Sequence, residues 1–408
     1  MTVVPEAISR PVAVRNDHLP RIAVIGDLLE ENWPSMDLVA EMLLQHLQTD
    51  FSEVLSASLI RPPMRRRLTN HRSEAGHQRS DLSVKFYNAD RVLNRFWDYP
   101  RFVKRLKSEF DLFHVVDHSY GQLLHELPPA QTVVTCHDLD TFKSLLNPTQ
   151  ESRSIFFRKM MSRTLSGFRQ AARVTCDSVA TRDELLAHNL VAPERAVVVP
   201  NGVHPSCSPN ADPVADAETK RWLGEPDPRA VDILHVGSTI PRKRIDVLLR
   251  IFADLRKEFP AARLVRVGGP FSPDQKKLAD ELEISGATLV LPHLDRNLLA
   301  AVYRRAAVVL VPSEREGFGL PVAEAMACGT PVVASDLPVL REVGGEAALY
   351  CSVDDISSWT KTVFQLLRQR ETGSQAWNDR RQAAICQASK FSWAEYTKKM
   401  VALYQELL

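Results

Sequence analysis

Short runs of apolar and β-branched residues recur along the chain and alternate with longer segments whose apolar residues follow a helical spacing. The runs cover residues 21–27, 51–60, 111–117, 131–138, 172–178, 195–202, 231–238, 262–269, 287–293, 306–313, 330–335 and 347–352. Continuous apolar runs separated by amphipathic helices are typical of parallel strands that are buried on both faces. Two successive sets of six runs predict an α/β protein with two doubly wound, Rossmann-like domains that face each other across a cleft.

The alternation breaks at residues 201–218, a segment rich in Pro, Asn and Asp that we interpret as the domain boundary. We therefore predict an N-terminal domain over residues 1–205 and a C-terminal domain over residues 206–389, with a final helix within 390–408. A chain of 408 residues also exceeds the usual size of a single compact core. Ligands of open parallel sheets bind beyond the carboxyl ends of the strands, so the cleft between the domains is the expected site.

The composition excludes some classes of protein but does not indicate a function. Lys and Arg together number 51 and Asp and Glu 50, so the net charge of +1 gives no general affinity for nucleic acid. The first twenty residues lack the apolar run of a signal peptide, and no stretch approaches the roughly 18 apolar residues that span a bilayer. The six cysteines are scattered without a C-x-x-C pair, as expected for buried residues in a reducing compartment. The sequence thus predicts a cytoplasmic protein.

One segment, "EREGFGLPVAEAMACGTPVVAS" from residue 314, places two carboxylates around a Gly-Phe-Gly turn. Glu316 lies in the loop that leaves a predicted strand, and Glu324 lies about one turn into the helix that begins near Pro321. The free amides at this helix start favour an anion or hydroxyl groups. The two carboxylates could accept hydrogen bonds from the vicinal hydroxyls of a sugar or ribose, or they could simply cap amides and complement the helix dipole.

The whole segment closely resembles the signature of the family 4 retaining glycosyltransferases, which have the two-domain GT-B architecture. The resemblance implies that Glu316 contacts the donor sugar and that Glu324 contacts the ribose of the donor nucleotide. It also implies donor-binding roles for the turn and the helix start, at Gly317, Phe318, Gly319 and Leu320.

A second segment, "HVGSTIPRKRIDVLL" from residue 235, carries adjacent basic residues at the carboxyl end of a predicted strand. Basic side chains in such a loop can neutralise a departing diphosphate, or they can form a solvated turn. The segment resembles the family's donor motif, which implies that Arg242 and Lys243 hold the diphosphate and that Gly237 lies at the donor site. Arg244 stands where the motif often has Asn, and Ser238 stands where some relatives have Arg, so we expect Lys243 to act with help from Arg242.

His137 ends the strand of "VVTCHDLDTF". A lone histidine at a strand end is usually structural, but the resemblance implies that His137 contacts the donor sugar. Leu294, at another strand end, is a predicted neighbour of the base. Arg266 could reach the diphosphate or serve as a packed or capping arginine. Asp138 and Asp140 alone do not indicate a metal site, and cationic side chains can replace Mg²⁺ as the counter-charge of a departing phosphate. We therefore expect no metal and no cofactor.

The acceptor side is less defined. Many relatives have a Gly-Gly loop after the first strand, whereas residues 26–43 of this chain contain only Gly26. The arginine-rich residues 61–79, followed by the aromatic residues of 94–106, allow two interpretations. They could rest on anionic lipid headgroups and collect a lipid-linked acceptor, which would place the protein peripherally on the inner face of the membrane, or they could form a solvated loop.

Taken together, the resemblance predicts a metal-independent retaining hexosyltransferase with a nucleotide diphosphate sugar donor, of the GDP-mannose or UDP-glucose type. Its acceptor would be a hydroxyl group of a glycan or lipid-linked sugar. The final helix should cross back to the first domain, as in similar enzymes. A nucleotide-sugar epimerase or phosphorylase of the same architecture, and a non-catalytic nucleotide-sugar-binding protein, remain as alternatives.

Overall fold

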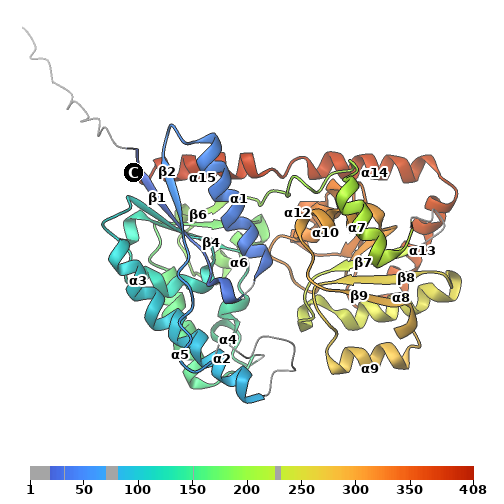
Figure 1. Cartoon of the computed structure of the whole chain (residues 1–408), viewed down its shortest axis with the longest axis horizontal. Coiled ribbons are helices and arrows are strands. Elements are labelled where there is room, and N and C mark those ends of the chain that lie inside the picture. Colours follow the sequence, from blue (N-terminus) through green and yellow to red (C-terminus); the bar gives the residue numbers. More distant parts are fainter. Residues whose placement is uncertain (1–18, 32, 70–80, 150, 226–230) are drawn as a thin grey trace, which may run out of the picture.

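The chain folds around two parallel sheets of six strands that lie side by side (Figure 1). The computed structural model describes residues 19–31, 33–69, 81–149, 151–225 and 231–408. Each of the twelve predicted apolar runs contains one strand, which confirms the predicted α/β class with two Rossmann-like sheets. The strands of the first sheet, in spatial order, are β2 (Ser56–Ile60), β1 (Arg21–Ile25), β3 (Leu112–Val115), β4 (Thr132–Cys136), β5 (Arg173–Cys176) and β6 (Ala196–Val198). Those of the second are β12 (Leu349–Cys351), β11 (Val332–Ser335), β10 (Val308–Val311), β7 (Asp232–Val236), β8 (Arg263–Val267) and β9 (Thr288–Leu291).

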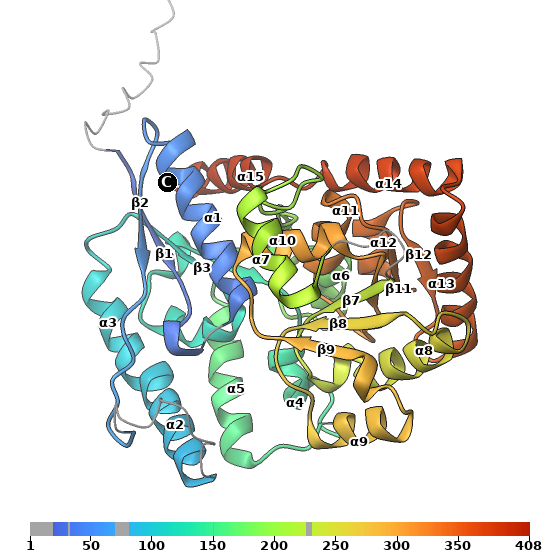
Figure 2. The same ribbon diagram turned by 45° about the vertical axis from the view of Figure 1, so that its right-hand side comes forward.

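Helices cover both faces of each sheet (Figures 1 and 2). The helices around the first sheet are α1 (Pro34–Asp50), α2 (Asp81–Leu93), α3 (Tyr99–Leu106), α4 (Lys143–Leu146), α5 (Ile155–Phe168) and α6 (Val179–Ala187). Those around the second are α7 (Pro213–Leu223), α8 (Ile245–Glu258), α9 (Pro273–Glu281), α10 (Arg296–Arg305), α11 (Leu320–Ala327), α12 (Pro338–Gly344), α13 (Ile356–Glu371) and α14 (Gln375–Ala388), and the chain continues into α15 (Trp393–Gln405).

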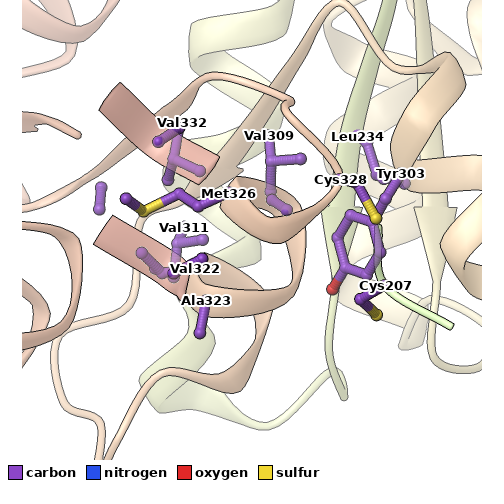
Figure 3. Close-up of a cluster of buried hydrophobic side chains, with 14 of the residues drawn as sticks. Cys207, Leu234, Tyr303, Val309, Val311, Val322, Ala323, Met326, Cys328 and Val332 are labelled. Carbon is purple, nitrogen blue, oxygen red and sulfur yellow. The ribbon is translucent and has the colours of Figure 1, made fainter. Parts of the chain in front are cut away.

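The strands are buried on both faces, as their continuous apolar sequences predict. On β1, Ala23 and Ile25 belong to one apolar cluster, while Ile22 and Val24 belong to another on the opposite face. This two-residue alternation is the direct result of strand geometry. The second sheet likewise separates two clusters, one of which is drawn in Figure 3. Five of the six cysteines are buried and unpaired, and Cys386 is exposed.

Helix α15 returns to the first sheet, as predicted. It packs beside α1 (Figures 1 and 2), and it contributes Trp393, Tyr396, Met400 and Tyr404 to the apolar cluster that contains β1. The Tyr404 hydroxyl also lies 2.6 Å from Nδ1 of His114, a buried residue of β3. The core of the first sheet is therefore completed by residues that follow the second sheet in the chain.

The predicted boundary segment 201–218 is only partly irregular. Residues from Pro213 onward form α7, because the Asp212 side chain accepts hydrogen bonds from the amides of Val214 and Ala215 and Pro213 suits the helix start. The chain passes between the sheets here and again between α14 and α15.

Both sheets have a point at which the strand order reverses. In the second sheet the order reverses between β7 and β10, and in the first sheet it reverses between β1 and β3. The helices that follow two such strands lie on opposite faces, which leaves a crevice at their carboxyl ends where ligands of this fold bind. The loops after β7, β10, β1 and β3 are thus the places at which functional side chains are expected.

Candidate functional site

The two loops at the switch point of the second sheet meet at Glu316. Lys243, in the 3₁₀ turn after β7, donates from Nζ to Oε1 of Glu316 at 2.6 Å. Arg242 donates from Nη1 to Oε2 of the same carboxylate at 3.2 Å. Ser313, the second residue after β10, donates to Oε1 at 2.7 Å. Three residues predicted for the site are therefore in direct contact, although they come from loops more than seventy positions apart.

This cluster is charged and largely buried. The Glu316 side chain is only 6% exposed. Burial alone would raise the pKa of this carboxyl, but the charges of Lys243 and Arg242 outweigh it and lower the pKa below its usual value. Burial likewise opposes the charge of Arg242, and Glu316 together with Asp138 raises the pKa of the guanidinium. The cluster therefore holds one carboxylate and two cations at neutral pH.

Arg242 also reaches across to the first sheet. Its Nη2 lies 3.7 Å from Oδ2 of Asp138, and its Nε lies 3.0 Å from Oδ2 of Asp140, two residues that follow β4. Arg315 approaches Asp140 as well, at 3.6 Å. These aspartates thus balance the cations of the opposite loops, a role that the sequence analysis did not assign to them.

A close backbone contact joins the same loops. A side chain at Gly317 would place its Cβ 1.7 Å from the carbonyl oxygen of His137, so only glycine fits here. The Gly317 carbonyl accepts hydrogen bonds from Ser178 Oγ at 2.8 Å and from Thr181 Oγ1 at 3.2 Å. Ser178 is also the N-cap of α6. Loops of the first and second sheets are therefore in direct contact at the predicted site.

Glu324 lies on the first turns of α11, with its side chain directed into the molecule. The hydroxyl of the buried Tyr303 donates to Oε2 of Glu324 at 2.9 Å. Burial raises the pKa of this carboxyl to about 7, with the Tyr303 bond acting in the opposite direction. Figure 3 shows Tyr303 on the edge of the apolar cluster beside Cys207 and Cys328. Pro321 is the second rather than the first residue of α11, because Gly319 is the N-cap, with a φ of 96°.

The other predicted residues near α11 face the core with their side chains. Phe318 is 5% exposed and packs edge-on against Phe391, with ring centroids 5.4 Å apart. Leu320 and Leu294 are partly buried against the same apolar cluster. Only backbone groups of the turn therefore remain for a ligand. Among the described residues, the amides from Gly317 to Leu320 have no backbone acceptor.

A buried arginine connects the loops after β7 and β8. Arg266, on β8, is fully buried, and its Nη2 donates to the carbonyl oxygen of Gly237 at 2.9 Å while its Nη1 donates to that of Gly269. A Cβ at Gly268 would lie 2.1 Å from the Gly237 carbonyl oxygen, so the two loops are in contact. In the described residues Arg266 has no carboxylate partner, and burial lowers its pKa to about 10. Arg266 is therefore a capping arginine for these loops, one of the two roles that the sequence left open.

His137 points away from the predicted donor site. Its Nδ1 lies 2.6 Å from Oδ2 of Asp177, and its Nε2 lies 2.7 Å from the carbonyl oxygen of Val116. Burial disfavours the charged ring, but Asp177 outweighs it, together with Asp117, and raises the pKa of His137 to about 10. Both ring nitrogens are used inside the first domain, so the geometry gives no ring nitrogen for the predicted sugar contact. The backbone of His137, by contrast, does lie at the site, against Gly317.

Several residues of the site escaped the sequence analysis. Most of them lie within three residues of the end of an apolar strand, and this position was the signal that could have identified them: Ser313, Asp177 and the pair Asp117–His118. Tyr303 carries no such signal. It lies in the last turn of α10, where an aromatic residue on the buried face of a helix cannot be told from an ordinary core residue.

Comparisons with known proteins agree with this geometry. The model of the family described as "Glycosyl transferases group 1" matches residues 216–383, and that of "Glycosyltransferase Family 4" matches residues 53–206. A D-inositol 3-phosphate glycosyltransferase of Corynebacterium efficiens is 30% identical over 321 residues, which cover 75% of this chain and 73% of that protein. The protein of the same description from Mycobacterium leprae (strain Br4923) is 40% identical over 185 residues. That match spans only 42% of the relative's length and 43% of this chain.

Solved structures share the fold at lower sequence identity. Sucrose-phosphate synthase from Thermosynechococcus elongatus superposes with a TM-score of 0.72 over 95% of this chain and 99% of its own, at 19% identity. Anabaena Alr3699/HepE in complex with UDP-glucose superposes with a TM-score of 0.69 over 95% of this chain and 99% of its own, at 14% identity. These likenesses show that the fold, over 95% of the chain, has already been seen in solved structures.

Proposed function

Since the chain belongs to family 4 of the glycosyltransferases and has the GT-B architecture, we propose that it transfers a hexose from a nucleotide diphosphate sugar to a hydroxyl group of a glycan or lipid-linked acceptor. The observation that carries this proposal is the contact of Lys243 and Arg242 with Glu316 at the switch point of the second sheet. The cluster combines cations suited to a diphosphate with a carboxylate suited to sugar hydroxyls.

The donor would lie along the loops of the second sheet. Only Oε2 of Glu324 is engaged by Tyr303, so Oε1 is the oxygen proposed to accept a hydrogen bond from a ribose hydroxyl. The free amides from Gly317 to Leu320, at the positive end of α11, would bind phosphate oxygens. Leu294 and the backbone at Gly237 would border the base. Glu316 would bind hydroxyls of the hexose.

The reaction follows from these placements. An acceptor oxygen bonds to the anomeric carbon, the bond from that carbon to the diphosphate breaks, and the electron pair stays on the departing phosphate. Lys243 and Arg242 stabilise the growing negative charge there, which is how the site would act without a metal ion. Attack on the same face as departure would retain the anomeric configuration, with the acceptor's proton passing to the departing phosphate oxygen. No second carboxylate is needed as a nucleophile in this scheme, unlike in retaining glycosidases.

The cations are not free before the donor binds. Lys243 and Arg242 are neutralised by Glu316, and Arg242 is also shared with Asp138 and Asp140 of the first domain. A diphosphate must compete with these carboxylates for the guanidinium. Donor binding would therefore weaken the charge contacts that join the two sheets and reorganise the loops that carry them.

A donor panel tests the proposal. Purified protein is mixed with UDP-, GDP- and ADP-sugars, and release of the nucleoside diphosphate is measured with and without an acceptor mixture. Stabilisation of the protein by free UDP, GDP or ADP identifies the base, because a ligand of the native state raises the Tm. GDP-mannose and UDP-glucose are the first donors to test. Binding without release would instead indicate a nucleotide-sugar-binding protein, and conversion of the sugar while it stays attached to the nucleotide would indicate an epimerase. A phosphorylase would show the absorbance of bound pyridoxal phosphate.

The acceptor could be presented at a membrane surface. Two aromatic side chains of the predicted segment 94–106 are exposed, Trp97 by 57% and Phe102 by 38%, whereas Tyr99 is buried. Phe86 of α2, which lies between the two predicted segments, is 46% exposed. The guanidinium of Arg101 lies 3.2 Å from the centre of the Trp97 indole ring. Residues 70–79 of the predicted basic segment lie outside the described residues. No described helix is both long and apolar enough to cross a bilayer.

We propose peripheral contact of this region with anionic lipid, through the aromatic and arginine side chains together. Sedimentation with liposomes that contain or lack anionic lipid measures it. Trp97→Ala should reduce binding, whereas Trp222→Ala, which changes an exposed tryptophan on α7 that is 44% accessible, should not. Equal and negligible sedimentation with both kinds of liposome would contradict the membrane contact.

A further inference from the structure

The first sheet has a switch point of its own, and the chain places a cluster of polar residues there. Asp27 follows β1, and Asp117 and His118 follow β3, the neighbouring strand across the reversal of order. Asp138 follows β4, the next strand along. All four residues thus lie at the carboxyl ends of adjacent parallel strands, the part of this fold that binds ligands.

His118 is held so that one ring nitrogen remains unused. Its Nδ1 accepts a hydrogen bond from the backbone amide of His137 at 3.4 Å and lies 3.3 Å from Oδ1 of Asp117. The Asp117 carboxylate is in turn fixed by hydrogen bonds from the backbone amide and hydroxyl of Ser119. The ring packs edge-on against Phe142, with centroids 5.5 Å apart. Although His118 is only 3% exposed, its Nε2 has no hydrogen-bond partner among the described residues. The nearest carboxylate oxygen is Oδ1 of Asp138 at 3.8 Å, which is beyond hydrogen-bond range.

Asp27 is a second unpaired group. It is 2% exposed, and neither of its carboxylate oxygens has a hydrogen-bond partner among the described residues. Burial, followed by the nearby charge of Asp117, raises the pKa of the Asp27 carboxyl well above its usual value. A neutral carboxyl can both donate and accept a hydrogen bond. Because buried polar groups in native proteins are almost always paired, unpaired atoms on Asp27 and His118 indicate partners that the chain itself does not supply.

The cluster adjoins the proposed donor site. Asp138 Oδ1 faces His118, and Oδ2 of the same carboxylate lies 3.7 Å from Nη2 of Arg242. Arg242 in turn contacts Glu316 at 3.2 Å. A hydroxyl group that bonds to both His118 Nε2 and Asp138 would therefore lie beside the carboxylate that also contacts Arg242 of the donor site.

We propose that His118, Asp138 and Asp27 form the acceptor subsite, and that the part of the acceptor bound there is an uncharged polyhydroxyl group. His118 Nε2 and the carboxyl groups exchange hydrogen bonds with hydroxyls, and Asp117 holds the imidazole in place. A phosphate next to the reacting hydroxyl is disfavoured because the carboxylates of Asp117 and Asp138 flank His118. This inference rests on the proposed function, since it assigns the acceptor of that same transfer.

Two substitutions at position 118 separate the roles of the two ring nitrogens. His118→Asn keeps an amide near the position of Nδ1, where its oxygen can accept from the His137 backbone amide, but removes Nε2. His118→Gln instead keeps an amide near the position of Nε2. His118→Asn should raise the acceptor KM about tenfold, as expected for the loss of one hydrogen bond of about 1.4 kcal/mol, and His118→Gln should recover most of that loss. His125→Asn is the matched control, because His125 lies on the same 3₁₀ helix but contacts Arg163 and Ser166 of α5 instead.

The readouts distinguish this inference from the proposed function. Nucleotide affinity should be unchanged in all three variants, because the nucleotide binds to the loops of the second sheet, and His125→Asn should also leave transfer unchanged. Equal acceptor KM values in the wild type and His118→Asn would overturn the subsite. It would also be overturned if both His118→Gln and His118→Asn raised the acceptor KM equally and lowered the Tm to the same extent. A wild-type protein that neither binds nucleotides nor releases them from any donor would instead contradict the proposed function.

The charge of the acceptor is tested with myo-inositol, a methyl glucoside and D-inositol 3-phosphate as probes, each titrated into nucleotide-saturated protein. The uncharged probes should bind more tightly than the phosphorylated one. Asp138→Asn should reduce the difference in affinity between the uncharged and the phosphorylated probes, since it removes one of the negative charges that flank His118. Binding of the phosphorylated probe alone, or of no uncharged probe, would overturn this assignment of the acceptor.

Discussion

The Lys243 ammonium and the Glu316 carboxylate form a 2.6 Å ion pair with both side chains almost fully buried. The pair joins the loop after β7 to the loop after β10, the two strands between which the order of the second sheet reverses. A buried charge without its partner is costly, so each residue holds the other in place before any ligand arrives. The same two groups are the ones proposed to act on opposite sides of the bond that breaks, on the diphosphate and on the hexose.

Lys243→Ala should lower kcat by about a hundredfold to a thousandfold, since charge on the leaving diphosphate grows as the bond breaks and one stabilising group has been removed. Free nucleotide affinity should change far less. Steady-state kinetics with the preferred donor, together with calorimetric titration of the nucleoside diphosphate, measures both. Lys257→Ala, at an exposed lysine of α8, is the control. A raised donor KM with an unchanged kcat would show that Lys243 only binds the donor.

Glu316→Gln should lower transfer by about tenfold to a hundredfold, the loss expected when charge-assisted hydrogen bonds to sugar hydroxyls are weakened. Nucleotide affinity should not fall, because Lys243 and Arg242 are then released from their carboxylate partner. If nucleotide binding and transfer fall in parallel, Glu316 contacts the ribose rather than the hexose. The substitution also removes a carboxyl whose pKa is lowered in the folded state, so its cost in stability should be present above pH 4.5 and disappear as the pH falls below it.

Glu324 should make nucleoside binding depend on pH. Burial raises the pKa of its carboxyl to about 7, so the acceptor of ribose hydroxyl bonds is only half ionised near neutrality. The affinity for the free nucleoside, which has no phosphate to titrate, should therefore rise as the pH increases from 6 to 8. Fluorescence or calorimetric titration across this range measures the effect, and Glu324→Gln should abolish the slope. A slope that persists in Glu324→Gln would assign the titration to another group.

Arg266→Met should weaken diphosphate binding more than nucleoside binding. Arg266 holds the carbonyl groups of Gly237 and Gly269 and places a buried positive charge beneath the loops that would contact the donor. We expect about a tenfold loss of affinity for the nucleoside diphosphate, the value of one charge-assisted hydrogen bond, with a smaller loss for the nucleoside. Arg250→Met, at an exposed position of α8, serves as the control. Equal losses for both ligands would mean that Arg266 shapes the whole pocket rather than the phosphate region.

The fold was predictable because its strands are buried on both faces. An apolar run such as residues 306–313 is apolar on both faces of the strand, so the sequence alone predicts both the position of the strand and its burial in a parallel sheet. The helical residues 213–218 were harder, because capping by Asp212 overrides a composition that is typical of a loop. The crossing of α15 was expected from the resemblance alone, since no local pattern shows which sheet a terminal helix will cover.

The sequence predicted the parts of the site in which a residue's position at the end of a strand determines its contacts. Glu316 and Lys243 follow strands that adjoin at a switch point, and side chains in such loops meet wherever the sheet has this topology. The orientation of a ring is a different matter. His137 and His118 both follow strands of the first sheet. The ring of His137, however, is directed into the first domain by its hydrogen bonds to Asp177 and to the Val116 carbonyl. Those partners come from neighbouring strands, so a linear pattern around residue 137 could not reveal them.

The return of α15 has a consequence for how the protein is made. Four large side chains of this helix fill the cluster around β1 and α1, and they are translated only after the entire second sheet has left the ribosome. The first sheet is therefore synthesised with one apolar face uncovered, and this face stays uncovered while the second sheet is made. During that interval chaperones can bind the exposed apolar face of the nascent chain, and the same face can cause aggregation. The exposure ends when Trp393 and Tyr404 pack against it.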